Sequence, residues 1–164
     1  MDAGTSDWAE RPYRPCVGIM LINQNNQIFA GRRIDTKLEA WQMPQGGIDL
    51  GEDVTTACFR EMREEIGTDK ARLLAEHPDW LKYDIPLPLA DQLWGGQFRG
   101  QAQKWVALRF TGSNADINIA TEEPEFSEWC WMDPGRLPHL AVPFKRSVYD
   151  SVLTEFSPLF LTSV

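Results

Sequence analysis

Apolar runs separated by short polar breaks divide the first part of the chain into strand-sized segments. Residues 16–22 (CVGIMLI) are continuously apolar, which is typical of a buried strand. The polar turn NQNNQ follows, and residues 28–33 (IFAGRR) predict the second strand of a hairpin. Residues 34–40 are polar and predict a loop, whereas Pro44 limits any strand within the short segment 41–44.

A helical period follows between residues 54 and 66. Asp53 is a suitable N-cap and Gly67 a suitable C-terminal stop, so both ends of this helix are marked. The apolar stripe that should face a sheet consists of Thr55, Cys58, Phe59, Met62 and Ile66. The adjoining face carries Glu61, Glu64 and Glu65, and we expect Arg60 and Arg63 on the far side of these carboxylates.

The second half of the chain alternates strands with long polar connections. We expect residues 71–85 to be strand-like in their second half and residues 86–100, with two prolines and three glycines, to form a long loop. Residues 103–110 (QKWVALRF) and 126–132 (FSEWCWM) predict two further strands. The segment 144–156 predicts the last helix, because Val148, Val152 and Phe156 recur on one stripe.

The three glutamates of the first helix point to a metal. Glu61, Glu64 and Glu65 are spaced i, i+3 and i+4, so they project from one face. Like charges at that spacing repel by roughly 0.2–0.5 kcal/mol per pair on an exposed helix. A hard divalent cation would compensate, and Mg²⁺ takes a few carboxylates while keeping positions for water and substrate phosphates.

Composition limits the class of protein. The 164 residues include 43% hydrophobic and 24% charged residues, which is ordinary for a globular protein with one core. We divide them into a flexible N-terminal arm, residues 1–13, and a single domain, residues 14–164. The net charge of −8 disfavours a broad nucleic-acid surface and DNA binding, but it permits a small basic pocket beside an acidic metal site. A monomer is expected.

The location of the protein is inferred from what the chain lacks. No apolar run approaches the ~20 residues of a membrane-spanning helix, and the N-terminus has no signal-peptide pattern. Cys16, Cys58 and Cys130 show no zinc-binding spacing, so we interpret them as reduced core residues of a cytoplasmic protein. His77 and His139 have no partner pattern and are expected at the surface.

The region from Gly46 to Gly67 resembles the signature of the Nudix hydrolases. That signature is a Gly, five residues, a Glu, seven residues, and then Arg-Glu-apolar-any-Glu-Glu-any-Gly-apolar. The matching positions are Gly46, Glu52 and the run from Arg60 to Gly67, and Thr68 is the one departure, in an apolar slot. Segments such as RPYRPCVGIML, WQMPQGGID and PEFSEW also resemble bacterial RNA pyrophosphohydrolases and the related diadenosine polyphosphate hydrolases, over residues 11 to about 156.

This resemblance implies a fold and a metal site. The fold would be α/β (α+β), a mixed β-sheet sandwiched between helices, with the signature as a loop–helix–loop. Glu61, Glu64 and Glu65 would hold Mg²⁺, with Mn²⁺ or another divalent cation as a substitute, and Glu125 would complete the site from a loop. Glu61, Glu64 or Glu125 would be the general base. Arg60 would orient the carboxylates.

Substrate recognition requires positive charge and an aromatic platform. Arg33 matches an arginine that contacts phosphate or base in the related enzymes. Arg14, Lys104 and Lys145 are further phosphate-binding candidates. Phe144 would stack on a purine, and Tyr83 and Trp94 are weaker candidates for the same role.

The resemblance implies a metal-dependent pyrophosphohydrolase. It would act on the 5′-triphosphate or 5′-diphosphate end of RNA, leave a 5′-monophosphate and so initiate mRNA decay. The alternative is asymmetric hydrolysis of a dinucleoside polyphosphate, for example diadenosine tetraphosphate to ATP and AMP. An ADP-ribose or nucleoside-triphosphate hydrolase is a further option. A catalytically inactive nucleotide-binding regulator would usually have a broken glutamate set, and here the set is intact.

Overall fold

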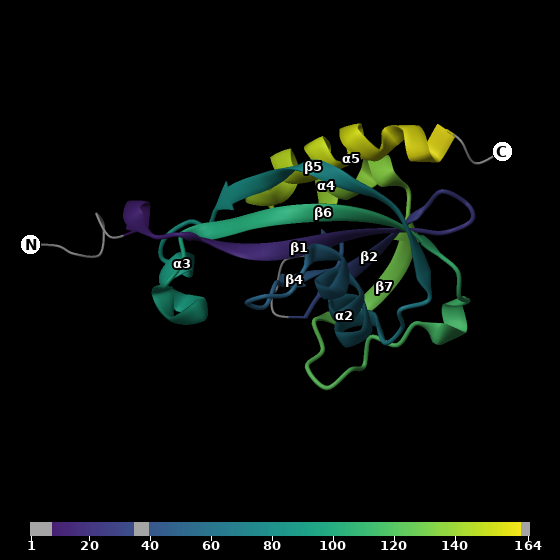
Figure 1. The fold of residues 1–164 in the computed structure, drawn as a ribbon, viewed down its shortest axis with the longest axis horizontal. Coiled ribbons are helices and arrows are strands. Elements are labelled where there is room, and N and C mark those ends of the chain that lie inside the picture. Colours follow the sequence, from purple (N-terminus) through teal and green to yellow (C-terminus); the bar gives the residue numbers. More distant parts are fainter. Residues whose placement is uncertain (1–7, 35–39, 162–164) are drawn as a thin grey trace, which may run out of the picture.

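The computed structural model describes residues 8–34 and 40–161 and contains one mixed sheet between helices (Figure 1). The strands are β1 (Tyr13–Ile22), β2 (Ile28–Arg33), β3 (Trp41–Gln42), β4 (Gln45–Gly47), β5 (Ala71–Asp84), β6 (Gly100–Phe110) and β7 (Phe126–Met132). The α-helices are α2 (Val54–Ile66), α3 (Leu89–Gln92), α4 (Leu137–Leu140) and α5 (Arg146–Leu161). Short 3₁₀ turns are η1 (Trp94–Gly96), η2 (Asn114–Asp116), η3 (Pro134–Arg136) and η4 (Pro143–Lys145). No helix in the described ranges is both long and apolar enough to cross a membrane.

Strand β1 is the centre of the sheet. The strand order is β3-β2-β1-β6-β5, with β4 also paired to β1 and β7 to β2. β1 and β6 run parallel from Tyr13 opposite Gly100 to Ile22 opposite Arg109. The other pairings among the described strands are antiparallel. A strand covered on both faces must be apolar throughout, which explains the unbroken run in β1.

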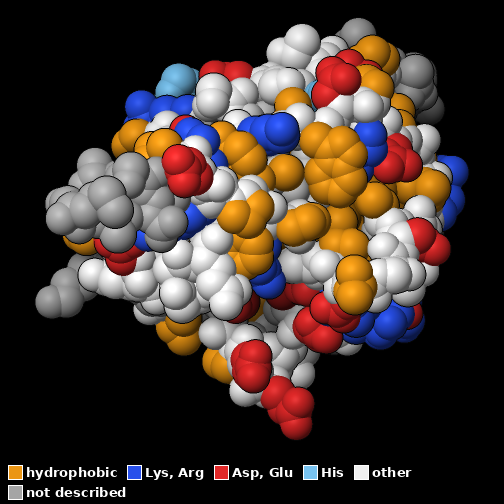
Figure 2. Space-filling model, turned by 60° about the vertical axis from the view of Figure 1, so that its left-hand side comes forward, with side chains coloured by type: hydrophobic (Ala, Val, Ile, Leu, Met, Phe, Trp, Pro, Cys, Tyr) orange, Lys and Arg blue, Asp and Glu red, His pale blue; other side chains and the backbone are white. Residues whose placement is uncertain are grey.

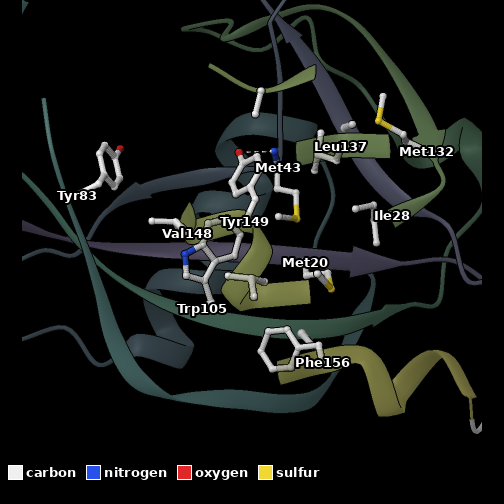
Figure 3. Packing of buried hydrophobic residues seen from close by; sticks show 14 of the residues in the cluster. Met20, Ile28, Met43, Tyr83, Trp105, Met132, Leu137, Val148, Tyr149 and Phe156 are labelled. Atoms are coloured by element: carbon white, nitrogen blue, oxygen red, sulfur yellow. Dashed lines mark hydrogen bonds between the residues drawn. The ribbon is translucent and has the colours of Figure 1, made fainter. Parts of the chain in front are cut away.

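The two faces of the sheet have separate hydrophobic cores. In β1, Val17, Ile19 and Leu21 pack with α2, whereas Met20 and Ile22 belong to the core beneath α5. Figure 1 shows α2 and α5 on opposite sides of the sheet. In the α5 core the backbone N–H of Met43 donates to the Tyr149 hydroxyl at 3.1 Å, which ties the segment before the signature to the last helix (Figure 3).

Helix α2 begins and ends where the sequence predicts. The Asp53 side chain accepts from the Thr56 N–H at 2.7 Å, and Gly67 ends the helix with φ of +75°. The predicted apolar stripe was wrong at Thr55, which is exposed, whereas Ala57 is buried in the core. Arg60 was also misplaced, because it lies against the carboxylates rather than on their far side.

Several predicted segments are more regular than expected. β5 spans residues 71–84 rather than their second half, because both ends pair with β6 across two register shifts. β1 and β6 each begin three residues earlier than predicted. The segment 86–100 contains α3 and η1. His77 is buried at 4% exposure, contrary to its predicted surface position, whereas His139 is exposed.

The N-terminal segment contacts the 86–100 region. Arg11 Nη2 lies 2.7 Å from Asp91 Oδ1, and Arg99 Nη1 donates to the Ala9 carbonyl at 2.8 Å. The indole of Trp8 donates to the Ile85 carbonyl at 3.3 Å. Residues 8–13 are therefore attached to the domain, although we expected a loosely attached arm over residues 1–13. Residues 1–7 lie outside the described part of the chain.

Candidate active site

A cleft of about 840 Å³ is lined by residues of the sheet, of helix α2, of the loop 121–125 and of η4. Its acidic lining residues are Glu61, Glu64, Glu65, Glu122, Glu123 and Glu125, and its basic ones are Arg14, Arg33, Arg63 and Lys145. Figure 2 shows a face of the molecule where hydrophobic side chains gather next to acidic and basic ones. Most of the predicted site residues line this one cleft, although they are distant in sequence.

The helix carboxylates occupy two different environments. Glu61 and Glu65 are only 8% and 6% exposed, whereas the Glu64 side chain is 58% exposed. Burial raises the pKa of Glu61 to about 7, and the Arg60 guanidinium opposes this rise. Burial, and then the charges of Glu61 and Glu125, raises the pKa of Glu65 well above its usual range. Both buried carboxylates therefore need more positive charge than the protein gives them.

Arg60 connects the signature loop to the helix. Its Nε and Nη2 donate to the two carboxylate oxygens of Glu52 at 2.8 Å each, and Nη2 also donates to the Gly47 carbonyl at 2.8 Å. Its Nη1 donates to Glu61 at 2.9 Å and to Glu64 at 3.2 Å. These hydrogen bonds lower the pKa of Glu52 to about 2 and hold the guanidinium in one position.

Gly46 leaves space for the buried carboxylate. A Cβ atom on Gly46 would lie 2.0 Å from the Glu61 carboxylate, so no other residue fits there without moving Glu61. The Gln45 backbone N–H next to it donates to Glu65 at 3.4 Å. The absence of a side chain at Gly46 thus lets strand β4 run directly against the acids of α2.

Glu125 lines the cleft from a loop outside the signature. It immediately precedes β7, and its backbone carbonyl accepts from the Ile34 N–H at 3.0 Å. Glu122, Glu123 and Thr121 from the same loop also line the cleft, and the Thr121 hydroxyl is buried with no partner among the described residues. The sequence did not single out these three residues, because a polar loop gives no periodic signal.

The donor set suits a divalent cation. Among the described residues no three His, Cys, Asp or Glu side chains form a closed ligand cluster as they stand. Arg60 instead lies against Glu61 and Glu64. Two buried carboxyl groups with raised pKa values beside further acids are an oxygen-rich set, and Mg²⁺ or a similar ion would stabilise their ionised forms.

Three basic side chains line the same cleft as the acids. Lys145 is 3% exposed and its Nζ donates to Gln42 Oε1 at 3.1 Å, while Arg33 Nη1 reaches the same oxygen at 3.5 Å. The Arg14 guanidinium lies 4.8 Å from the centre of the Trp94 ring. Lys104 does not line the cleft. Its Nζ donates to the Pro78 carbonyl at 2.9 Å, so the structure does not bring this predicted residue to the site.

Aromatic and apolar side chains form another wall. Phe144 and Tyr83 line the cleft with their ring centres 5.6 Å apart. Tyr83 is 93% buried and its hydroxyl donates to Gln101 at 2.8 Å. The ring therefore packs within the wall, and little of its surface is available for stacking on a base. Trp94, beside Leu89 and Leu93, has a φ of +49°, a rare conformation for a bulky residue.

Three glutamines in the cleft were missed by sequence reasoning. Gln42, Gln45 and Gln101 line it, and Gln103 lies buried behind them. A signal was available, because residues 101 and 103 are polar at alternate positions of a strand whose same face continues into the buried Trp105. Polar residues on a core-facing row indicate a hydrogen-bonded network.

Comparisons with known proteins agree over most of the chain. The NUDIX domain model matches residues 12–152. An RNA pyrophosphohydrolase of Rhodospirillum rubrum is 60% identical over 146 residues, covering 89% of this chain and 88% of that protein. One from Dinoroseobacter shibae is 52% identical over 153 residues, covering 92% and 96%. One from Rickettsia typhi is 50% identical over 159 residues, covering 97% and 99%.

Solved structures share the fold at low sequence identity. The dihydroneopterin triphosphate pyrophosphohydrolase of E. coli is 17% identical with a TM-score of 0.65, covering 88% of this chain and 99% of that chain. The Ap4A hydrolase of C. elegans is 16% identical with a TM-score of 0.62, covering 90% and 98%. At these identities the likeness concerns the fold alone.

Proposed function

The chain belongs to the NUDIX domain family and is a Nudix hydrolase, and from this premise we propose that it is an RNA pyrophosphohydrolase. It would convert a 5′-triphosphate or 5′-diphosphate end of RNA to a 5′-monophosphate and so initiate mRNA decay. Relatives at 50–60% identity that match nearly the whole chain bear the name RNA pyrophosphohydrolase. The observation that carries the proposal is one cleft that is lined both by acids of α2 and by basic side chains.

The acids would hold the metal that Nudix hydrolases generally need. We assign Glu61, Glu64, Glu65 and Glu125 as ligands and Mg²⁺ as the ion, with Mn²⁺ as a substitute. When bound, the ion would polarise phosphate oxygens and lower the pKa of the attacking water. Arg60 would keep Glu61 and Glu64 oriented through its bond to Glu52.

The remaining side chains would bind the polyphosphate and the base. Arg14, Arg33 and Lys145 supply positive charge in the same cleft as the acids, so they would bind the negatively charged phosphates. Phe144, which lines the same cleft, would stack on an unpaired base. The cleft would bind the phosphorylated end of a chain and leave most of the polymer without contact, which agrees with a net charge of −8 over the whole chain.

The reaction is a hydrolysis of a phosphoanhydride bond. Water attacks phosphorus, the bond between phosphorus and the bridging oxygen breaks, and pyrophosphate or phosphate leaves. The water proton goes to a carboxylate, for which Glu61, Glu64 and Glu125 are the candidates that line the cleft. Burial raises the pKa of Glu61 to about 7.

The test compares two substrates at equal concentration with Mg²⁺. We expect release of pyrophosphate or phosphate from a 5′-triphosphorylated oligoribonucleotide to be faster than cleavage of diadenosine tetraphosphate. Turnover of diadenosine tetraphosphate alone would overturn the RNA assignment and leave the hydrolase class intact. We also propose that the protein is a cytoplasmic monomer. The free Cys16 and Cys58 of the core are consistent with the cytoplasm, where thiols stay reduced. Sedimentation of the purified protein tests whether it is a monomer.

A further inference from the structure

A buried glutamine behind the cleft connects the hydrophobic core to the site. Gln103 is 1% exposed and does not line the cleft. Its Oε1 accepts from the Trp105 indole Nε1 at 3.0 Å. Its Nε2 donates to Gln45 Oε1 and to Gln101 Oε1 at 2.7 Å each. Both of these neighbours line the cleft, so Gln103 lies between the core and two groups that can meet a substrate.

The indole fixes the direction of every hydrogen bond in this network. An indole N–H can only donate, so the Gln103 atom that faces Trp105 must be the carbonyl oxygen. The Gln103 amide nitrogen then faces the two neighbours, and both of them must accept with their carbonyl oxygens. Gly18 makes this position of the indole possible, because a Cβ there would lie 2.3 Å from the Trp105 ring.

The consequence is that two amide NH₂ groups are turned away from Gln103. The Gln101 oxygen is also occupied by the Tyr83 hydroxyl, which donates to it at 2.8 Å. The Gln101 Nε2 has no acceptor within the described ranges, and the residue lines the cleft. The Gln45 oxygen is occupied by Gln103 in the same way, so the Gln45 NH₂ group is also turned away from Gln103.

We propose that Gln103 is a positioning residue that makes Gln45 and Gln101 present N–H donors, rather than carbonyl oxygens, to the polyphosphate of the substrate. The proposal rests on the proposed function and extends it to residues outside the signature. Hydrogen bonds from neutral amides to an anion are stronger than those between neutral groups, whereas a carbonyl oxygen turned to the same anion repels it. The direction of the two amides therefore decides between binding and repulsion.

Two substitutions of Gln103 test whether the direction of the Gln45 and Gln101 amides decides between binding and repulsion of the polyphosphate. Gln103→Met keeps the volume and removes the hydrogen bonds, so the neighbouring amides lose their fixed direction. Gln103→Glu keeps an acceptor for Trp105 but can no longer donate, so Gln45 and Gln101 must turn their N–H groups inward and their oxygens outward. Gln92→Glu is the matched control, because it makes the same change of charge at an exposed glutamine outside the cleft.

Affinity for inorganic tripolyphosphate, measured by calorimetry, is the first readout. We expect binding to weaken about tenfold in Gln103→Met and about a hundredfold in Gln103→Glu. The Gln92→Glu protein should stay within about twofold of the parent, since surface charges are screened. Equal affinity of Gln103→Met and the parent for tripolyphosphate would overturn the proposal. This comparison tests the proposal even if the Gln103→Glu protein does not fold.

Kinetics on a 5′-triphosphorylated oligoribonucleotide are the second readout. Loss of ground-state phosphate contacts raises KM by about tenfold in Gln103→Met while kcat stays within about threefold. A packing defect would instead lower kcat through a smaller active fraction and leave KM unchanged, and that result would contradict the positioning role. If the parent does not hydrolyse the oligonucleotide, the proposed function fails, while tripolyphosphate binding still decides the role of Gln103.

Discussion

Arg60 and Glu52 form a two-pronged ion pair, with Nε and Nη2 of the guanidinium each 2.8 Å from a different oxygen of the carboxylate. Such a fork fixes both the place and the plane of the guanidinium. The remaining Nη1 is thereby aimed at Glu61 and Glu64, at 2.9 and 3.2 Å. Glu52 therefore acts on the two proposed metal ligands through Arg60.

Glu52→Gln should lower activity without unfolding the protein. An amide accepts only one of the two hydrogen bonds and carries no charge, so Arg60 is free to turn away from Glu61 and Glu64. Partners that orient metal ligands typically contribute about 10- to 100-fold in activity or metal affinity. We expect a loss in that range in Mg²⁺-dependent hydrolysis, partly restored by raising the Mg²⁺ concentration. A loss that Mg²⁺ does not affect would contradict the indirect role.

Glu64→Gln should abolish most of the activity and leave stability nearly unchanged. The Glu64 side chain is 58% exposed, so its loss removes no core contact. Removing a ligand weakens metal binding and the activation of water, and we expect activity to fall by at least about a hundredfold. Glu155→Gln, on the exposed side of α5, is the control and should keep parental activity. Full activity of Glu64→Gln would exclude the residue as a ligand.

Trp94→Ala should weaken substrate binding. The indole lines the cleft over Arg14, and stacking of a base on an aromatic ring contributes about 1–3 kcal/mol. Alanine meets the same steric penalty at a φ of +49°, so the change in KM reports the loss of the indole ring and not a change in backbone strain. We expect KM for the oligonucleotide to rise roughly 5- to 150-fold. Trp80→Ala, at a 45% exposed tryptophan outside the cleft, should leave KM unchanged.

Gly67→Ala should destabilise the fold. The residue has a φ of +75°, and a Cβ there would lie 2.8 Å from the Asn118 carbonyl oxygen. Both effects disfavour alanine, and we expect the free energy of unfolding in urea to fall by about 1–3 kcal/mol. Gly135→Ala is the matched control, because open space surrounds the added Cβ and the backbone is not in the left-handed region. Equal stability of the two variants would refute the assignment of Gly67 as an obligatory C-cap.

Local patterns predicted the elements whose boundaries depend on nearby residues. β2, β7 and α2 have the predicted bounds, because turn residues and the caps Asp53 and Gly67 mark their ends. β5 was predicted too short, since its first half (ARLLAEH) has no β-branched residue and no Phe, Tyr or Trp, and is held in the strand by pairing with β6. His77 was misplaced for a similar reason, because its burial depends on α5 packing over β5.

The sequence by itself implied the reaction class, through the resemblance of residues 46–67 to the Nudix signature, and the spacing of Glu61, Glu64 and Glu65 placed three acids on one face of one helix. Tertiary structure decided which residues meet those acids. It brought Arg14, Arg33 and Lys145 into the cleft and kept Lys104 out of it, although all four are ordinary basic residues in the sequence. It also decided the direction of the amides of Gln45 and Gln101, because hydrogen-bond polarity is set by partners such as Trp105 that only folding brings into contact.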